Sequence, residues 1–303
     1  MPDTTKTLLR RVIAVINGKG GVLKTTLVAN IAGLLAANGY RILVVDLDPQ
    51  GNLAEDFGYD QADDNDEGLA LAQGLMFGQA PAIRRSVREN LDVLVGGPEL
   101  DSAAAGLAAR KKKDPRTALA TLLEGIAGDY DLILIDCPPG DELLQSNAIA
   151  AARWALVPVK SDKSSRKGLE AVAKRLDGVL DINPDLDLLG VVLTDIGSTA
   201  SVVERKARQG VAELFGFSDV VFTSTVRHSE ATAQTARELG KLVVELEADA
   251  KDGPAWWQVR RGEASATNTI PATATSVSGD LQAVAQEIVD RLAAAEARQE
   301  QPA

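Results

Sequence analysis

The stretch NGKGGVLKTT, residues 17–26, follows the apolar run RVIAVIN of residues 11–17 and leads into a helical pattern that ends at Gly39. Glycines after a buried strand let the backbone turn tightly and aim several N–H groups at one point, and the helix N-terminus adds its dipole there. In such a loop Lys24 reaches the β and γ phosphates of a nucleotide, and the Thr25 hydroxyl binds Mg²⁺. The stretch therefore predicts a phosphate-binding loop whose nucleotide-binding residues are Gly18, Lys19, Gly20, Gly21, Val22, Leu23, Lys24, Thr25 and Thr26.

Two features set this loop apart from the strict pattern G-x-x-x-x-G-K-[ST]. Leu23 stands where the second glycine belongs, and a side chain there crowds the loop. An additional lysine, Lys19, lies early in the loop.

Apolar runs rich in β-formers alternate with helical patterns along most of the chain. Continuous apolar strands joined by crossover helices indicate strands that are buried on both faces. The sequence thus predicts an α/β fold with a doubly wound, mostly parallel sheet and helices on both faces, as in P-loop NTPases. The expected strands are residues 11–17, 41–45, 91–95, 131–135, 155–159 and 188–193.

Three aspartates follow two of these strands. Asp46 and Asp48 come two residues apart after the second strand, so their side chains point the same way at the carboxyl edge, where doubly wound sheets bind ligands. Asp136 ends the strand of residues 131–135, the Walker B arrangement that holds Mg²⁺, usually through water.

Composition limits the alternatives. The single Cys137 excludes an internal disulfide framework, and the single His228 excludes a multi-histidine metal site. We expect Cys137 to be a packed core residue. No run approaches the ~18 apolar residues of a membrane span, and no secretory signal is evident, so a cytoplasmic location is expected.

The 303 residues carry a formal net charge of −11, the wrong sign for a protein that touches nucleic acid. The acids are concentrated in two places: residues 55–67 hold seven acids and no lysine or arginine, and residues 245–303 hold ten acids against five basic residues. The remaining chain is nearly neutral. The negative net charge therefore comes from an acidic segment, which we interpret as a solvated loop, and from an acidic tail. It does not argue against a DNA-binding face on the rest of the chain.

The C-terminal part departs from the alternating pattern. Residues 248–279 are rich in Gly, Pro, Ser, Thr and Ala and show no periodicity, which indicates a flexible insertion. Residues 280–298 form an amphipathic pattern whose polar face is acidic, so we expect this helix to pack on the sheet and not to bind a membrane surface. The predicted organisation is a P-loop domain at 1–247, the insertion at 248–279, and a terminal helix and tail at 280–303.

These motifs resemble the ParA/MinD superfamily. The loop resembles its deviant Walker A motif, the run DLDPQGN of residues 46–52 its switch I, DCPP of residues 136–139 its Walker B segment, and TSTVRHSEA of residues 223–231 a further family segment. The resemblance covers residues from about 11 to 247 and the final helix, and it points to the short type of ParA protein without an N-terminal DNA-reading domain.

The resemblance implies an ATPase that uses ATP and Mg²⁺, dimerises with itself on ATP, and binds DNA without sequence preference. It also implies a ParB-like centromere-binding partner that stimulates slow hydrolysis. No membrane partner is implied, and the expected location is the cytoplasm, in association with the nucleoid. The implied catalytic residues are Lys19, Lys24 and Asp48. In the family, the early lysine reaches the nucleotide of the second protomer, and the aspartate at the position of Asp48 orients the attacking water. The implied magnesium ligands are Thr25, Asp46, Asp48 and Asp136.

Non-specific DNA binding needs a cluster of basic residues on one face. The resemblance points to Arg205, Lys206 and Arg208 on one helix and to Arg227 in a later loop; an ordinary solvated helix face is the alternative. Two other basic runs, residues 110–113 and 160–167, compete for this role.

Two other functions stay open. A ParA-like ATPase can position another cellular cargo by the same mechanism. Alternatively, the departure from the phosphate-loop pattern at Leu23 suggests a nucleotide-switched binding scaffold with negligible hydrolysis.

Overall fold

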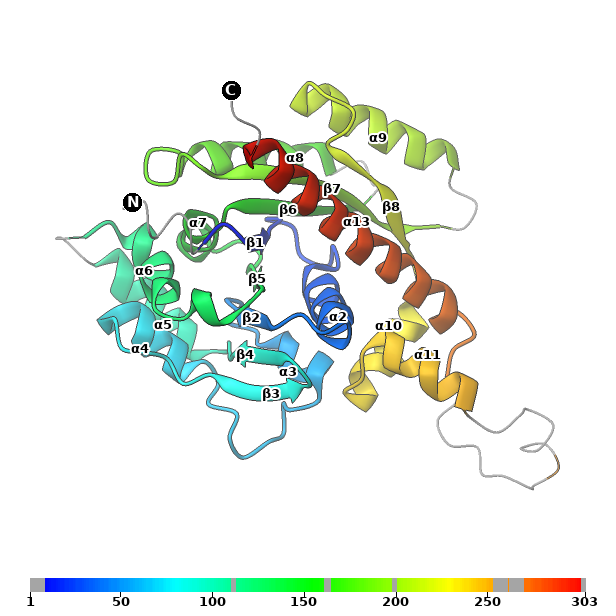
Figure 1. Ribbon diagram of the computed structural model, residues 1–303, viewed down its shortest axis with the longest axis horizontal. Helices are drawn as coiled ribbons and strands as arrows, with labels where there is room; N and C mark the ends of the chain where they lie inside the picture. The colour runs from blue at the N-terminus through cyan, green and yellow to red at the C-terminus, as the bar shows by residue number, and fades with distance from the viewer. Residues whose placement is uncertain are drawn as a thin grey trace.

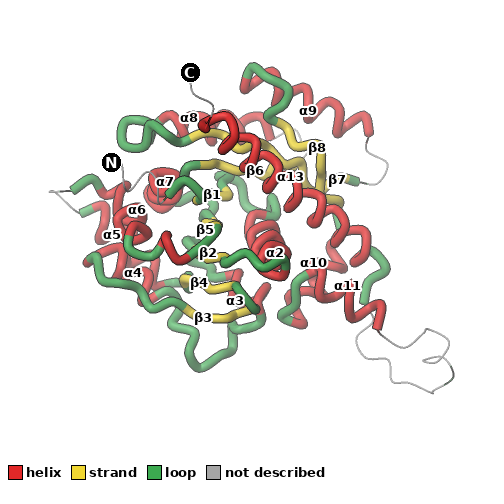
Figure 2. Tube along the Cα trace, viewed as in Figure 1, coloured by secondary structure: helices red, strands yellow, loops and turns green. Residues whose placement is uncertain are grey.

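A twisted sheet of eight strands lies at the centre of the computed structural model, which describes residues 9–109, 113–160, 165–197, 201–252, 261 and 270–300 (Figures 1 and 2). The strand order is β3-β4-β2-β5-β1-β6-β7-β8, and every pair is parallel except β3 with β4. The strands are β1 (Val12–Val15), β2 (Ile42–Asp46), β3 (Arg84–Arg88), β4 (Leu91–Leu94), β5 (Leu132–Asp136), β6 (Trp154–Lys160), β7 (Asp187–Ile196) and β8 (Val221–Arg227).

Helices cover both faces of the sheet, because successive side chains of a strand point to opposite sides. Ala14 of β1 joins a core that includes α4 to α9, while Ile13 and Val15 join a core that includes α2, α3, α10, α11 and α13 (Figure 1). These helices are α2 (Lys24–Ala37), α3 (Asn52–Phe57), α4 (Leu69–Phe77), α5 (Glu99–Ala108), α6 (Ala118–Glu124), α7 (Glu142–Ala151), α8 (Ser165–Asp177), α9 (Ser201–Phe215), α10 (Glu230–Leu239), α11 (Val243–Asp252) and α13 (Ala274–Glu300), with short 3₁₀ turns η1 (Pro115–Thr117) and η2 (Ala127–Asp129).

The predicted doubly wound, mostly parallel sheet is confirmed. The six expected strands are present as β1, β2, β4, β5, β6 and β7. The sequence pattern missed the two edge strands: β3 is short and rich in arginine, and β8 has three hydroxyl residues in its middle. Edge strands are only half buried and lose the continuous apolar run that marks the others.

Two expectations about polar segments are corrected. Residues 55–67 do not form a solvated loop throughout, since the acidic run begins inside α3, where Asp56 is 6% exposed and bonded to Arg237, and Tyr59 is buried as well. The segment of residues 248–279 is helical at both ends, because α11 runs to Asp252 and α13 begins at Ala274, where Ala274 and Val277 pack in the core. Most of residues 253–269, including the Trp256–Trp257 pair, lies outside the described residues.

The helix α13 packs along β8, α2 and α11, far from it in sequence, as the red helix of Figure 1 shows. Its apolar residues Leu281, Val284 and Ile288 are buried on the α2 side of the sheet. None of the described helices combines the length and hydropathy that a membrane span requires.

Candidate nucleotide site

The glycine-rich loop lies at the carboxyl edge of β1 and is tied to the neighbouring strands. The Asn17 side chain donates to the carbonyl of Pro158 in β6 and accepts from the backbone N–H of Lys19, at 2.8 and 2.9 Å. The Thr194 hydroxyl of β7 donates to the carbonyl of Val22 at 3.2 Å. Both contacts with the strands are buried, so the loop is held from two strands that lie on the same side of β1. No pattern in the sequence predicts a role for Asn17 or Thr194.

Leu23 adopts a left-handed backbone conformation, with φ 66° and ψ 27°, directly before α2. This region favours glycine, since a Cβ there costs about 1–2 kcal/mol. The Leu23 side chain is partly buried and packs against the core on the α2 face. The expected crowding is therefore avoided: the side chain points to the core and the backbone takes the conformation of the missing glycine.

The mouth of the loop is open. A Cβ built at Gly18, Gly20 or Gly21 would meet no other group of the described residues within 4 Å. Helix α2 begins without a side-chain cap and without an acid in its first turn, so its first N–H groups and its dipole face an uncompensated site. This geometry suits an anion such as a phosphate group.

Lys24 begins α2 and is 6% exposed. Its ammonium donates to the carbonyl of Lys19 across the loop at 3.3 Å. Burial lowers the pKa of Lys24 from its ordinary value, and the charges of Asp136 and Asp48 oppose that shift. The lysine is thus desolvated and folded over the loop, beside two carboxylates.

Asp46 and Asp136 are direct partners in the register of β2 and β5, so their side chains lie next to each other on one side of the sheet. Both are 1% exposed. Within the described part of the chain, no well-aligned hydrogen bond reaches either oxygen of Asp136 or Oδ2 of Asp46, and the nearby Thr25 hydroxyl lowers the pKa of Asp136. Burial raises the pKa of Asp136 to about 7, and burial together with the Asp136 charge raises that of Asp46 well above its usual range.

Asp48 lies in the loop that we call switch I, residues 46–52. The Oδ1 atom of Asp46 accepts from the backbone N–H of Asp48, and that of Asp48 accepts from the N–H of Gln50, both at 3.0 Å. Burial raises the pKa of Asp48 above its ordinary value, and the Gln50 N–H and the Lys24 charge oppose that shift. The structure thus brings Lys24, Asp46, Asp48 and Asp136 together at the carboxyl edge of the sheet, beside Thr25.

These residues fit a magnesium ion. Buried carboxylate oxygens without a hydrogen bond need a cation or water, since an unpaired buried charge is costly. No three carboxylate, histidine or cysteine side chains converge on one point among the described residues. Mg²⁺ needs no such cage, because it keeps several waters and takes one or two carboxylates together with substrate phosphates.

A second polar cluster lies at the carboxyl ends of β6, β7 and β8. Asp195 pairs with Lys160 at 2.8 Å and with His228 Nδ1. Asp195 also has a left-handed backbone, with φ 60°. The sequence pattern did not predict this cluster. Lys160 belongs to one of the competing basic runs, and no local pattern shows that the strands before Lys160, Asp195 and His228 end side by side.

The predicted DNA-binding residues are not equivalent. Arg205 and Lys206 are exposed on α9. Arg208 donates to the carbonyls of Phe222 and Thr223 in β8 and pairs with Glu204, and both oxygens of the Asp280 carboxylate bind Arg227. Of the competing runs, residues 110–112 and 161–164 lie outside the described residues.

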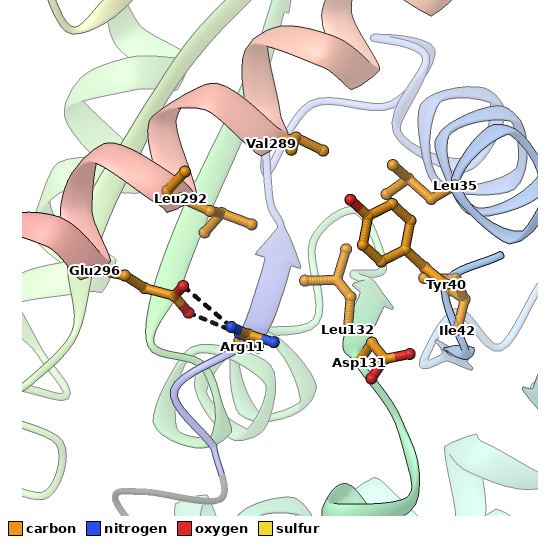
Figure 3. A pocket seen from close by; sticks show the side chains of 10 residues that line it. Arg11, Leu35, Tyr40, Ile42, Asp131, Leu132, Val289, Leu292 and Glu296 are labelled. Carbon is orange, nitrogen blue, oxygen red and sulfur yellow. Dashed lines mark hydrogen bonds and ion pairs between the residues drawn. The ribbon is translucent and has the colours of Figure 1, made fainter. Parts of the chain in front are cut away.

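A cavity of about 200 Å³ lies at the opposite edge of the sheet, where β1, β2 and β5 begin (Figure 3). Its wall is mostly apolar, with Leu132 and Leu292 among its residues, and Arg11 pairs with Glu296 at its rim. It lies at the amino ends of the strands and therefore cannot hold a nucleotide bound by residues 17–26. Cys137 is fully buried, as expected, and burial raises the pKa of its thiol well above the ordinary value.

Residues 10–188 match a family described as an AAA domain. The chain is 35% identical over 228 residues to the chromosome partitioning protein ParA of Myxococcus xanthus, covering 73% of this chain and 77% of that protein. It is 35% identical over 188 residues, 61% of this chain and 72% of the relative, to the sporulation initiation inhibitor protein Soj of Bacillus subtilis.

Solved structures share the fold. A complex of McdA from Cyanothece with ATP has a TM-score of 0.70 at 18% identity, over 94% of this chain and 97% of that one. Cobyrinic acid a,c-diamide synthase from Mycobacterium smegmatis with bound ADP and magnesium has a TM-score of 0.62 at 29% identity, over 82% of this chain and 99% of that one. The loop of residues 17–26, its carboxylates and these matches lead to one conclusion: the chain belongs to the ParA/MinD-type family of partition ATPases.

Proposed function

We propose that this protein is an ATP-dependent partition ATPase that dimerises on ATP, binds DNA without sequence preference and segregates a DNA cargo with a ParB-like partner. The observation that carries the proposal is the buried set of Lys24, Asp46 and Asp136 at the open mouth of the loop. In this proposal residues 1–247 belong to the ATPase unit and α13 packs on it. The insertion predicted at residues 248–279 is shortened to residues 253–273, because α11 runs to Asp252 and α13 begins at Ala274.

The chain's own residues bind and orient the nucleotide. The backbone of residues 18–26 and the Lys24 ammonium hold its phosphates, since charge developing on the transferred phosphoryl group is stabilised mainly by fixed donors. Thr25, Asp46 and Asp136 hold Mg²⁺, directly or through water, and this ion neutralises phosphate charge when bound. Asp48, fixed by the N–H of Gln50, orients the attacking water. Lys19 reaches the nucleotide of the second protomer.

A DNA-binding role is supported by the exposed pair Arg205 and Lys206. Arg208 and Arg227 remain part of the proposed surface, but their guanidinium groups are bound within the chain. We therefore assign the phosphate contacts first to Arg205 and Lys206. The proposed location is the cytoplasm, in association with the nucleoid.

A second candidate is a nucleotide-switched scaffold with negligible hydrolysis. Leu23 favours it, because this residue holds a strained left-handed backbone at the position where the strict loop pattern has glycine. A third candidate is a ParA-like ATPase with the same mechanism that positions another cellular cargo, such as a protein assembly, instead of DNA.

Phosphate release with DNA and the ParB-like partner present distinguishes the first two candidates. The ATPase predicts slow turnover that rises with both additions and that Asp48→Ala abolishes while ATP binding persists. ATP binding without stimulated turnover would establish the scaffold. Unchanged turnover in Asp48→Ala would remove this residue from the mechanism.

A further inference from the structure

The helix that follows switch I ends against a distant helix. Residue Gly58 ends α3 and Gly240 ends α10, and both have a left-handed backbone. A Cβ on Gly58 would lie 2.9 Å from the Gly240 carbonyl oxygen, and one on Gly240 would lie 2.4 Å from the Gly58 Cα. The two backbones thus touch at glycines that admit no side chain.

This meeting of two helix C-termini is electrostatically unfavourable by itself. Each C-terminus carries about half a negative charge on its last carbonyl groups. Arg88 of β3 lies between them and donates to the carbonyls of Phe57 and Gly240, both at 3.1 Å. Its guanidinium is oriented by Glu245 at the start of α11, with a shortest contact of 2.6 Å. Arg88 therefore neutralises both helix ends at once.

A second ion pair joins the same helices. Arg237 in the last turn of α10 donates to Asp56 in the last turn of α3, at 2.9 Å. The Asp56 side chain is 9% exposed and the Arg237 side chain 43%, so the carboxylate is protected from solvent while the guanidinium reaches the surface. We call Asp56, Gly58, Arg88, Arg237 and Gly240 the clasp.

Each helix in the clasp continues from a functional segment. Helix α3 has only six residues and starts directly after switch I, which carries Asp48. Helix α10 starts at its N-cap Ser229, directly after Arg227 and His228, and the backbone N–H of His228 bonds to the end of β7 at 3.1 Å. Both helices are short, with six residues in α3 and ten in α10, and the clasp fixes the C-terminal end of each.

We infer that Arg88 and Arg237 are positioning residues: through the clasp they hold switch I in the geometry for hydrolysis and transmit the nucleotide state to residues 227–239. This inference rests on the proposed ATPase function and adds to it a connection between the nucleotide site and the segment after β8. Neither arginine belongs to the phosphate loop or to switch I: Arg88 lies in β3 and Arg237 in α10.

The test compares Arg88→Gln with Arg85→Gln, a control on the same strand whose ion pair with Asp92 lies outside the clasp. Arg88→Gln is expected to lower kcat for ATP hydrolysis about fivefold or more and to change KM by less than about twofold, because the phosphate loop is untouched. Arg85→Gln is expected to match the wild type, and Arg88→Lys to recover part of kcat. Arg237→Gln, which leaves Arg88 in place, repeats the test if Arg88→Gln fails to fold.

Hydrogen exchange supplies a readout that a merely structural role would not move. In the wild type and Arg85→Gln, a non-hydrolysable ATP analogue should slow exchange in residues 18–26, 46–57 and 228–239. In Arg88→Gln or Arg237→Gln the protection should remain at residues 18–26 and be lost at 228–239. A lower Tm with kcat, KM and the protection pattern unchanged would overturn the inference. Absence of turnover in the wild type would instead refute the proposed ATPase.

Discussion

Leu23 shows at the scale of one residue what the sequence predicts and what it does not. The sequence pattern shows that a leucine replaces the second glycine of the phosphate-loop motif, and it predicts that the side chain crowds the loop. It could not predict the backbone angles of Leu23, which decide where the side chain goes. The structure keeps the left-handed conformation that a glycine would adopt and turns the side chain to the core, where it is partly buried. Two opposing free energies therefore act at this position: backbone strain of about 1–2 kcal/mol and burial of an apolar side chain.

A series at this position separates the two effects. Leu23→Gly should keep ATP affinity and stability within about 1 kcal/mol of the wild type, because relief of strain offsets lost burial. Leu23→Val should lower the free energy of unfolding and weaken ATP binding despite its apolar side chain, since β-branched residues are disfavoured at positive φ. Chemical denaturation and nucleotide titration measure both quantities. A neutral Leu23→Val would show that the left-handed conformation is not needed.

The carboxylates and the loop were predictable for a chemical reason. Acids at the ends of apolar strands meet at one edge of a parallel sheet, so Asp46 and Asp136 could be placed from sequence alone. Asn17 and Thr194 could not, because their contacts depend on which two strands follow β1 on one side of it in the sheet, β6 and then β7. The order of strands in the sheet is a property of the folded chain and leaves no local signal.

At the scale of elements, the edge strand β8 is covered by charged side chains. Both oxygens of Glu287 in α13 accept backbone N–H groups, those of Thr223 and Ser224, each at 2.9 Å. Arg291 of α13 donates to the carbonyl of Val221 at 3.2 Å. An exposed edge strand is a template for aggregation, and α13 occupies its free donors and acceptors.

Glu287→Gln tests this cover. Burial raises the pKa of Glu287, but the N–H groups of Ser224 and Thr223 and the Arg291 guanidinium together hold it below its ordinary value. A lowered folded-state pKa stabilises the protein above the unfolded pKa of about 4.3, and this contribution is lost as pH falls through the folded value. The variant should lose about 1–2 kcal/mol at neutral pH, since an amide offers one acceptor oxygen.

The matched control for this prediction is Asp290→Asn, one turn along α13, where the carboxylate bonds only to the exposed Gln286 in the described structure. It should leave stability within about 0.5 kcal/mol. Denaturation from pH 7 to acid should show a weaker loss of stability for Glu287→Gln than for the wild type. Equal loss in both variants at neutral pH would remove Glu287 from its role.

For the whole molecule, the charge distribution decides what net charge means. The excess of acids over basic residues lies in residues 55–67 and 245–303, and the structure uses several of these acids within the fold: Asp56, Asp280 and Glu287 all bind arginine. Arg208 and Arg227 are engaged in the same way. The sequence could identify the basic run on α9, but only the contacts separate its exposed members from those that hold β8.

Salt dependence measures this separation. The double variant Arg205→Gln/Lys206→Gln should reduce the slope of log affinity for duplex DNA against log salt concentration by about 1.8, or 0.9 for each lost phosphate contact. Arg41→Gln, whose ion pair with Asp131 lies at the opposite edge of the sheet, should leave the slope unchanged. An unchanged slope in the double variant would move the DNA contacts to another basic run.

In the proposed function, ATP held by Lys24 and its neighbours controls DNA binding. The most direct measurement is the affinity for a non-specific duplex at one salt concentration, with a non-hydrolysable ATP analogue, with ADP and without nucleotide, for the wild type and Lys24→Ala. The wild type should bind at least about tenfold more tightly with the analogue than with ADP, and Lys24→Ala should show no difference. Equal wild-type affinity in all three states, or a nucleotide response retained by Lys24→Ala, would contradict the account.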